Sequence, residues 1–238
     1  MIFERTEHPA WLSNAYLDAE GPSGRGVLVD GNGVAEPLVQ RVEHEEIEVT
    51  HILVTHRHAD HVEGVEGLSQ RFGVPVLGFD ELADGEVVRS GELEIEALFT
   101  PGHAADHVAF LVDGNECLTG DALFRRTVGG TRGGGPSGFA DLKRSIMERL
   151  LTLPPETRVH PGHREATTVG EEWAENPFVR LWRGLDREDA EPCRVRGVDA
   201  TLVLWTRDYD GGHKAWVRFA SGEDAIVGGS QIERLSTL

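Results

Sequence analysis

The segment His56-Arg57-His58-Ala59-Asp60-His61 constrains this chain most, because four side chains that can bind a metal ion fall within six residues. It directly follows Ile52-Leu53-Val54-Thr55, an apolar, β-branched run that predicts a buried strand. Residues two apart in an extended segment point the same way, so the first two histidines are expected to reach one metal ion. The Asp and His at the end come after a turn and are expected to face a second, adjacent site. A solvated histidine-rich loop is the alternative, and this spacing after a strand argues against it.

Three further residues of ligand type follow apolar runs later in the chain, and a glycine directly precedes each of them. They are found in Pro101-Gly102-His103, Gly120-Asp121 and Pro161-Gly162-His163. Glycine can adopt backbone angles closed to other residues, which suits a sharp turn at the end of a strand. We therefore expect four strand ends to converge on one rim and to build a metal cluster from residues far apart in the chain.

Apolar runs alternate with turn residues over the first 181 positions, which predicts a mixture of strands and helices. Residues 80–91 are acidic and contain glycine, so a loop is expected there. Asp141 is expected to cap the helix that follows it. The expected strands lie at 12–17, 26–30, 47–55, 74–77, 93–99, 108–112 and 157–160, and the expected helices near 36–42, 62–72, 141–151 and 168–181, the last broken at Asn176-Pro177.

The character of the sequence changes after Asp186. Residues 186–192 are charged and contain proline, which indicates a linker. Short β-type runs follow at 201–205, 214–219 and 225–227, and Trp205, Trp216 and Phe219 are expected to form their small core rather than a binding platform. We therefore divide the chain into a main domain (1–185), a linker (186–192) and a small antiparallel β domain (193–238), either an SH3- or Tudor-like barrel or a hairpin extension.

Charge and cysteine usage restrict the function classes. The net charge is 23 − 41 = −18, which disfavours nucleic acid and anionic membrane surfaces, because both are bound through Lys and Arg. Cys117 and Cys193 form no CxxC pair, so both are expected to be reduced in a cytoplasmic protein. Neither a signal peptide at the N-terminus nor an apolar stretch near the roughly 20 residues of a membrane span is found.

The motif His56-x-His58-x-Asp60-His61, followed in order by the three glycine-preceded ligands, resembles the metallo-β-lactamase superfamily over residues 10–182. The resemblance implies a mixed α/β fold, a four-layer αββα sandwich, to which the small all-β domain is appended. It also implies a dinuclear metal site on one edge, with zinc as the first expectation and iron or manganese as alternatives. By position, one metal would take His56, His58 and His103, the second would take Asp60, His61 and His163, and Asp121 would bridge the two.

Within the superfamily the chain most resembles glyoxalase II-like hydrolases, through Gly120-Asp121-Ala122-Leu123-Phe124 and the segment from Thr167 to Phe178. It departs from them in three respects. Residues 127–135 stand in place of their Gly-Arg element, the Tyr, Lys and Arg that bind glutathione have no clear counterparts, and the β domain replaces a long helical domain. These departures concern the glutathione part of the substrate more than the hydrolysis itself.

The leading hypothesis is a metal-dependent hydrolase in which a bridging hydroxide attacks a small acyl thioester or ester. Metal-bound water falls in pKa from 15.7 to about 7, so hydroxide is available at neutral pH. Asp60, which would orient the hydroxide, and Asp121, which would bridge the metals, are the catalytic candidates. The expected partner is a small-molecule acyl substrate, without nucleic acid or membrane, and a second copy of the chain is a further candidate.

Other functions stay open. The tetrad His58-Ala59-Asp60-His61 also resembles persulfide dioxygenases, in which His56, His103 and Asp121 would hold a single iron. A lactonase or a nuclease of the same fold is a second alternative, and the net charge makes an RNA-processing role more distant. The β domain is also considered as an interaction module for a partner or a second copy.

Several residues near the motifs have alternative interpretations. His107 and His160 are expected to be hydrogen-bonded structural histidines, and Asp106 is a candidate to orient a ligand imidazole. Gly133–135 lacks the Gly-Lys-Ser/Thr of a phosphate loop. The arginines after Asp121 either bind an acidic group of the substrate or lie in a solvated loop; they are Arg125, Arg126 and Arg132. Four histidines are expected to be surface or structural residues: His8, His44, His51 and His213.

Overall fold

The structure is a computed structural model of the 238-residue chain, and it describes residues 1–131 and 137–235. Arg132 and Gly133–135, named above, lie outside the described residues. None of the helices in the part of the chain that is described has the length and apolar character needed to cross a membrane.

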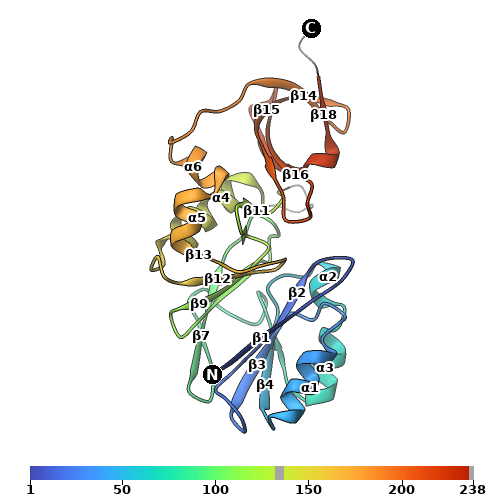
Figure 1. Cartoon of the computed structure of the whole chain (residues 1–238), viewed down its shortest axis with the longest axis vertical. Coiled ribbons are helices and arrows are strands. Elements are labelled where there is room, and N and C mark those ends of the chain that lie inside the picture. Colours follow the sequence, from blue (N-terminus) through green and yellow to red (C-terminus); the bar gives the residue numbers. More distant parts are fainter. Residues whose placement is uncertain (132–136, 236–238) are drawn as a thin grey trace.

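The N-terminal half forms a five-stranded sheet covered on its outer face by helices (Figure 1). The first three strands pair antiparallel, and the last two add in parallel through helical crossovers. The apolar faces of the two longer helices pack on the sheet through residues such as Leu38, Val42 and Leu68. In sheet order, the strands are β1 (Ile2–Glu7), β2 (Asn14–Ala19), β3 (Arg25–Val29), β4 (Glu48–Leu53) and β5 (Val76–Leu77), and the helices are α1 (Glu36–His44), α2 (Ala59–Val62) and α3 (Val65–Phe72).

The second half forms a six-stranded sheet in the order β13-β12-β9-β8-β7-β6. All its pairs are antiparallel except β9 with β12, and a small ribbon of β10 with β11 lies beside it. The strands are β6 (Val87–Ser90), β7 (Leu93–Phe99), β8 (Val108–Val112), β9 (Glu116–Gly120), β10 (Leu123–Phe124), β11 (Thr127–Val128), β12 (Arg158–Pro161) and β13 (Thr167–Thr168), and the helices are α4 (Phe139–Glu148), η1 (Leu150–Thr152), α5 (Val169–Glu175) and α6 (Pro177–Trp182).

The two sheets pack face to face, with helices outside both. Leu53 and Val29 of the first sheet meet Ile95, Val108 and Phe110 of the second in one buried cluster. Two further clusters bury the helices against the outer face of each sheet. The layers are therefore helix, sheet, sheet and helix, and the predicted αββα fold class is confirmed.

The C-terminal residues form a five-stranded antiparallel sheet, here called the tail sheet, in the order β17-β16-β15-β14-β18. It curls into a separate lobe beside the sandwich (Figure 1). Its own core contains Leu202, Val217 and Phe219. The elements are β14 (Glu191–Val195), β15 (Val198–Arg207), β16 (His213–Phe219), β17 (Asp224–Gly228), η2 (Gly229–Gln231) and β18 (Ile232–Arg234).

Trp216 belongs to a different core from the predicted one. It packs with Val203 and Ile226 in the cluster that contains Leu142 of α4, and its ring lies 4.9 Å from that of Phe139. Successive strand residues point to opposite faces. Val217 therefore faces the core of the tail sheet, while Trp216 faces the sandwich.

Several element boundaries differ from the sequence prediction. β1 was not predicted, and β6 lies inside the expected loop at residues 80–91. Both are edge strands with mixed polarity, so they are stabilised by pairing with β2 and β7 rather than by their own pattern.

Asp141 is the third residue of α4 instead of its cap and accepts a hydrogen bond from the Gly138 N–H at 3.3 Å. β14 begins at Glu191, inside the expected linker. The predicted break at Asn176-Pro177 is confirmed, because Asn176 caps α6.

Candidate metal centre

Four loops that follow strands carry the predicted ligands to one rim of the sandwich. The loop after β4 carries His56 and His58, the second in extended backbone, and continues into the single turn of α2, which carries Asp60 and His61. The loops after β7, β9 and β12 supply the other three, which are His103, Asp121 and His163. The expected convergence of strand ends is therefore observed.

The first group of ligand atoms consists of three imidazole nitrogens. Nδ1 of His58 lies 3.0 Å from Nε2 of His56 and 2.9 Å from Nε2 of His103. All three atoms lie within 4.8 Å of one another, which is the spacing expected around a shared cation.

The second group lies beside the first and combines two imidazoles with a carboxylate. Oδ2 of Asp60 lies 3.4 Å from Nε2 of His163 and 3.6 Å from Nε2 of His61. These three ligand atoms also lie within 4.8 Å of one another. The residues of the HxHxDH segment thus divide between two adjacent groups.

Asp121 lies between the two groups. Its Oδ2 lies 3.5 Å from Nε2 of His103 and 3.4 Å from Nε2 of His163, and its Oδ1 lies 3.3 Å from Nε2 of His61. The structure therefore brings together all seven side chains predicted as ligands, which we call the seven-residue cluster. That these residues bind metal stays a prediction.

Two buried atoms in the cluster fit a pair of metal ions. Nε2 of His61 and Oδ1 of Asp121 lie 3.3 Å apart, and neither forms a hydrogen bond among the described residues. A buried polar atom without a hydrogen bond is costly, and cations placed among these nitrogen and oxygen atoms would lower that cost. Imidazole and carboxylate are ligands that zinc, iron and manganese all accept.

The charges in the cluster are strongly coupled. Burial and the neighbouring His61 hold the pKa of His56 well below its usual value. Burial opposes ionisation of Asp121, but the imidazoles of His163 and His61 outweigh it and hold the pKa of that carboxyl well below its usual value. Burial also opposes ionisation of His163 and lowers its pKa, but the negative charge of Asp121 outweighs this and raises the pKa to about 9. The carboxylates thus attract positive charge to this rim.

Asp30 supports the cluster from behind, and the sequence analysis missed it. It is buried, and its Oδ2 accepts hydrogen bonds from Nδ1 of His61 at 2.9 Å and from the Thr55 hydroxyl at 2.8 Å. Its Oδ1 accepts the Thr55 N–H at 2.8 Å. A carboxylate behind a ligand histidine fixes the ring orientation and raises its basicity. The available signal was the position of Asp30 directly after an apolar strand, as with the ligands.

The other candidates near the ligands have structural roles. Nε2 of His107 accepts a hydrogen bond from the Asp121 N–H at 3.0 Å, and Nε2 of His160 lies 2.6 Å from Glu116, so both are hydrogen-bonded as predicted. His103 is oriented by the Gly130 carbonyl, 2.9 Å from its Nδ1. Among the described residues, Asp106 forms no bond to an imidazole, so Asp30 takes the role predicted for it.

Two of the three glycines before ligands act as predicted, and the third acts differently. Gly102 and Gly120 have φ values of 141° and 46°, which other residues rarely adopt. Gly162 has no such angle, but a Cβ there would overlap Oδ1 of Asp121 and lie 2.9 Å from Cε1 of His61. Gly162 is therefore needed for space inside the cluster.

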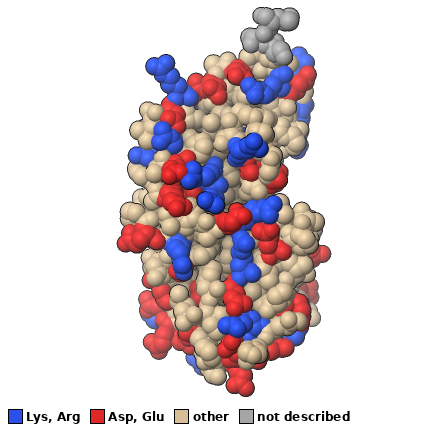
Figure 2. Space-filling model, in the orientation of Figure 1, with Lys and Arg blue, Asp and Glu red and all other residues tan. Residues whose placement is uncertain are grey.

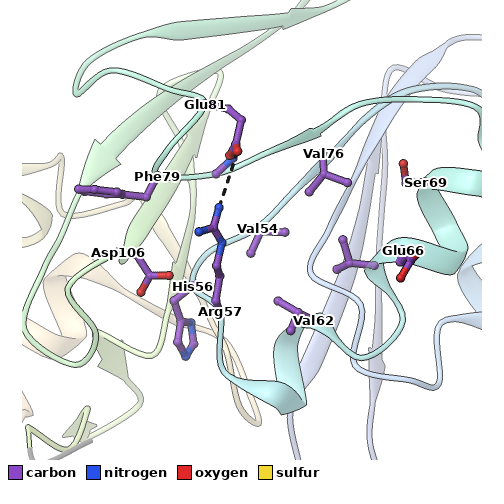
Figure 3. Close-up of a pocket in the computed structure, with 12 residues that line it drawn as sticks. Val54, His56, Arg57, Val62, Glu66, Ser69, Val76, Phe79, Glu81 and Asp106 are labelled. Atoms are coloured by element: carbon purple, nitrogen blue, oxygen red, sulfur yellow. Dashed lines mark hydrogen bonds and ion pairs between the residues drawn. The ribbon is translucent and has the colours of Figure 1, made fainter. Parts of the chain in front are cut away.

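Among the cavities lined by described residues, two border the cluster. One, of about 410 Å³, lies against His163 and is lined by three arginines, two acidic residues and an aromatic residue of the tail sheet, namely Arg125, Arg126, Arg164, Glu165, Asp208 and Tyr209. The other, of about 360 Å³, is bounded largely by apolar side chains such as Val54 and Phe79. Figure 3 shows the His56 ring pointing away from the other residues that line this second cavity. The first cavity is therefore bordered by His163, and the second by His56, whose ring points out of it.

The fold and the cluster define a class, an αββα sandwich whose rim can hold metal ions. A family model described as the metallo-beta-lactamase superfamily matches residues 9–85. The chain is 30% identical to hydroxyacylglutathione hydrolase GloC of Haemophilus influenzae over 64% of this chain and 86% of that protein. It is 36% identical to a human hydroxyacylglutathione hydrolase-like protein over 76% of this chain and 67% of that protein. The chain belongs to the metallo-β-lactamase superfamily.

Solved structures agree with this assignment. ETHE1 from Myxococcus xanthus aligns with a TM-score of 0.71 and 32% identity, covering 75% of this chain and 84% of that one. TTHA1623 in a di-iron-bound form aligns with a TM-score of 0.63 and 33% identity, covering 75% of this chain and all of that one. Both alignments leave a quarter of this chain unmatched.

Proposed function

We propose that this protein is a metal-dependent hydrolase that cleaves a small acyl thioester or ester. The observation that carries the proposal is the convergence of the seven-residue cluster, with Asp121 between two complete ligand groups. The names of the relatives at 30% and 36% identity support a thioester as the substrate class. The residues that bind glutathione in glyoxalase II-like hydrolases have no clear counterparts in this chain, so the proposal does not specify the thiol half of the substrate.

The two groups define which residues would hold the cofactor. One cation would take His56, His58 and His103, a second would take Asp60, His61 and His163, and Asp121 would contact both. When bound, divalent cations supply Lewis acidity, which lowers the pKa of a coordinated water and polarises a carbonyl. Zinc is the first candidate, and the di-iron neighbour supports iron as an alternative.

The side chains of the cluster and its neighbours would orient the water and hold the metal-binding groups in position. Asp60 is the more accessible carboxylate, with 26% of its side chain exposed against 7% for Asp121, so it is the one that would orient the attacking water. Asp121 is held through its backbone N–H by His107, which keeps its carboxylate between the two groups. His61 is held by Asp30, so its ring stays aimed at Asp121.

The test is turnover together with metal content. We expect protein loaded with zinc, iron or manganese to hold about two ions per chain and to hydrolyse members of a panel of thioesters, esters and lactones. Metal content is measured by atomic emission, and turnover by release of thiol or acid. Fewer than one ion per chain, with no turnover after loading, would contradict the proposal.

A mononuclear iron dioxygenase is the second candidate. The three residues that it needs also converge, because Nε2 of His103 lies 3.5 Å from Oδ2 of Asp121 and the His56 ring centre lies 5.0 Å from that of His103. The alignment with ETHE1 at 32% identity supports keeping it.

The substitution His163→Ala separates the two candidates, because it removes a ligand of the second group only. The hydrolase proposal expects it to remove one of two ions and to lower hydrolysis at least about 100-fold. The dioxygenase proposal expects iron-loaded protein to keep consuming oxygen with glutathione persulfide after this substitution. Absence of oxygen uptake in iron-loaded wild-type protein excludes the dioxygenase.

A further inference from the structure

The tail sheet inserts an aromatic residue beside the seven-residue cluster. Tyr209 lies in the loop between β15 and β16, and its ring stacks on that of His163 with centres 4.5 Å apart and an angle of 16° between the planes. It also lies 4.8 Å from the ring of Phe124. A residue from the C-terminal part of the chain therefore contacts a predicted ligand directly.

Buried contacts fix the position of this loop. The ammonium of Lys214 lies 3.0 Å from Oδ2 of Asp208, and both side chains are less than 10% exposed. Asp208 also donates its N–H to the Gly212 carbonyl at 3.1 Å, and Arg164 donates Nε–H to the Tyr209 carbonyl at 3.3 Å. Because charge-assisted bonds of this kind are strong when buried, Tyr209 is held in place.

Tyr209 lines the 410 Å³ cavity together with several charged side chains. Three arginines line the cavity against two acidic residues, in a chain whose net charge is −18. Figure 2 shows Lys and Arg side chains gathered where the tail sheet meets the sandwich, with acidic side chains around them.

The three arginines that line the cavity differ in whether an acidic side chain already pairs with them. Arg126 pairs with Glu175, and Arg164 pairs with Glu7 at 3.0 Å. Arg125 is exposed and has no ion-pair partner in residues 1–131 and 137–235. Of the two acids, Asp208 is neutralised by Lys214, while Glu165 is exposed. Arg125 is therefore the cation with free hydrogen-bonding capacity.

The cavity thus combines the free guanidinium of Arg125, an aromatic wall at Tyr209 and an edge formed by His163 of the cluster.

We propose that this cavity is the substrate subsite, and that it selects acyl thioesters carrying a carboxylate, which Arg125 binds while Tyr209 of the tail sheet forms the wall. Arginine presents a planar fork that matches a carboxylate. The inference rests on the proposed hydrolysis, because the cavity borders a ligand of the proposed centre. It assigns to the tail sheet a direct part in substrate selection.

The experiment compares matched substrates on the metal-loaded, full-length protein. Succinyl-N-acetylcysteamine carries a carboxylate on the acyl half, S-butyryl-thioglycolate carries one on the thiol half, and butyryl-N-acetylcysteamine carries none. We expect one of the two anionic thioesters to exceed the neutral one in kcat/KM by about 10-fold or more, since a charge-assisted contact is of that strength. The anionic thioester with the higher kcat/KM identifies which half of the substrate, acyl or thiol, occupies the cavity.

Variants of the lining residues test which side chains cause the preference for an anionic thioester. Arg125→Gln is expected to remove the preference for the anionic thioester, mainly through KM. Arg187→Gln changes an exposed arginine outside the cavity and is expected to keep the preference. Tyr209→Ala is expected to lower kcat/KM for all three thioesters about 10-fold, whereas Tyr209→Phe keeps the ring and stays within about 2-fold of wild type. Thermal unfolding of each variant confirms that it is folded.

A binding measurement separates this inference from the proposed function. Calorimetric titration is done with succinate, the acid released from the first thioester, and with glycolate, the oxygen analogue of the thioglycolate released from the second. Both are expected to show binding that Arg125→Gln weakens about 10-fold. If no thioester is hydrolysed but this binding is found, the hydrolase proposal fails and the anion subsite stands. If thioesters are hydrolysed without charge preference, or Tyr209→Ala and Arg125→Gln behave as wild type, the subsite is overturned.

Discussion

Single side chains behind the ligands determine how well the cluster is organised. Asp30 has a φ of 60° and accepts three hydrogen bonds from two residues, one of which is the predicted ligand His61. His107 holds the backbone of Asp121 in the same way, and burial lowers the pKa of His107 to about 3, so it stays a neutral acceptor. Both residues are buried, and their effect is on the position and basicity of the residues they contact.

Removing the charge of Asp30 is therefore expected to weaken metal binding without removing a ligand. Asp30→Asn should lower metal affinity about 10–100-fold, because it removes the carboxylate that accepts the His61 N–H. Affinity is measured by competition with a chromophoric chelator. Asp106→Asn is the control and should bind metal as wild type does. Equal affinity in Asp30→Asn and wild type would show that Asp30 has no role in metal binding.

The buried carboxyl of Asp18 in β2 is expected to make the free energy of unfolding depend on pH. It is fully buried, neither carboxyl oxygen has a hydrogen-bond partner among the described residues, and burial with the charge of Asp113 raises its pKa from 3.8 to about 7. The folded state thus holds a proton that the unfolded state releases near pH 4. This carboxyl therefore destabilises the fold progressively as pH rises from about 4 to about 7.

Asp18→Asn should remove that part of the pH dependence. Its free energy of unfolding is expected to exceed that of wild type at pH 8 by up to about 4 kcal/mol, and the difference should shrink toward zero near pH 4. Urea unfolding at a series of pH values measures it. Parallel pH profiles for the two proteins would contradict this assignment.

At the scale of elements, strand ends and the short turns after them bring the ligands together. The parallel pairing of β9 with β12 places the turns before Asp121 and His163 side by side, and Gly162 donates its N–H to the Gly120 carbonyl at 2.7 Å. Periodicity predicted the longer strands, and Pro177 predicted the break before α6. Periodicity did not predict β1 or β6, because edge strands take their stability from the neighbouring strand.

A methyl group at Gly162 should therefore disrupt the cluster. Gly162→Ala is expected to reduce bound metal to less than one ion per chain, because the new Cβ would overlap the Asp121 carboxylate. Gly67→Ala is the matched control: this α3 glycine has open space around it, so the change should stabilise the fold by about 0.5–1 kcal/mol. Metal analysis and thermal unfolding measure both, and full occupancy in Gly162→Ala would refute this account.

At the scale of the whole molecule, the tail sheet and the sandwich share a core. Trp216 and Ile226 pack against Leu142 of α4, and Thr131 exchanges two backbone and hydroxyl hydrogen bonds of 2.9 Å with Ile226. This face of the tail sheet is therefore covered by the protein itself, and a partner or second copy would have to use another face. Unfolding of the two parts is expected to be one transition.

Trp216→Ala tests that coupling. It should lower the free energy of unfolding by about 3–5 kcal/mol, as for other large buried aromatic residues, and the loss should appear in one cooperative transition. Trp173→Ala is the control: that side chain is 39% exposed and stacks with Arg183, so about 1 kcal/mol or less is expected. Calorimetry that resolves an early tail transition in wild type would contradict the shared core.

The sequence alone predicted the seven cluster residues, because the ligand types occur at strand ends in a spacing that is local to each motif. Its resemblance to a known superfamily predicted the fold class. The sequence also placed arginines just after Asp121. Only the tertiary structure decided that Asp30 holds His61, that Trp216 faces α4 and that Tyr209 stacks on His163. Each of those contacts joins segments distant in the chain, and no local periodicity encodes which face of one segment meets another. Packing sets these contacts, and they position the ligands and line the cavity beside them.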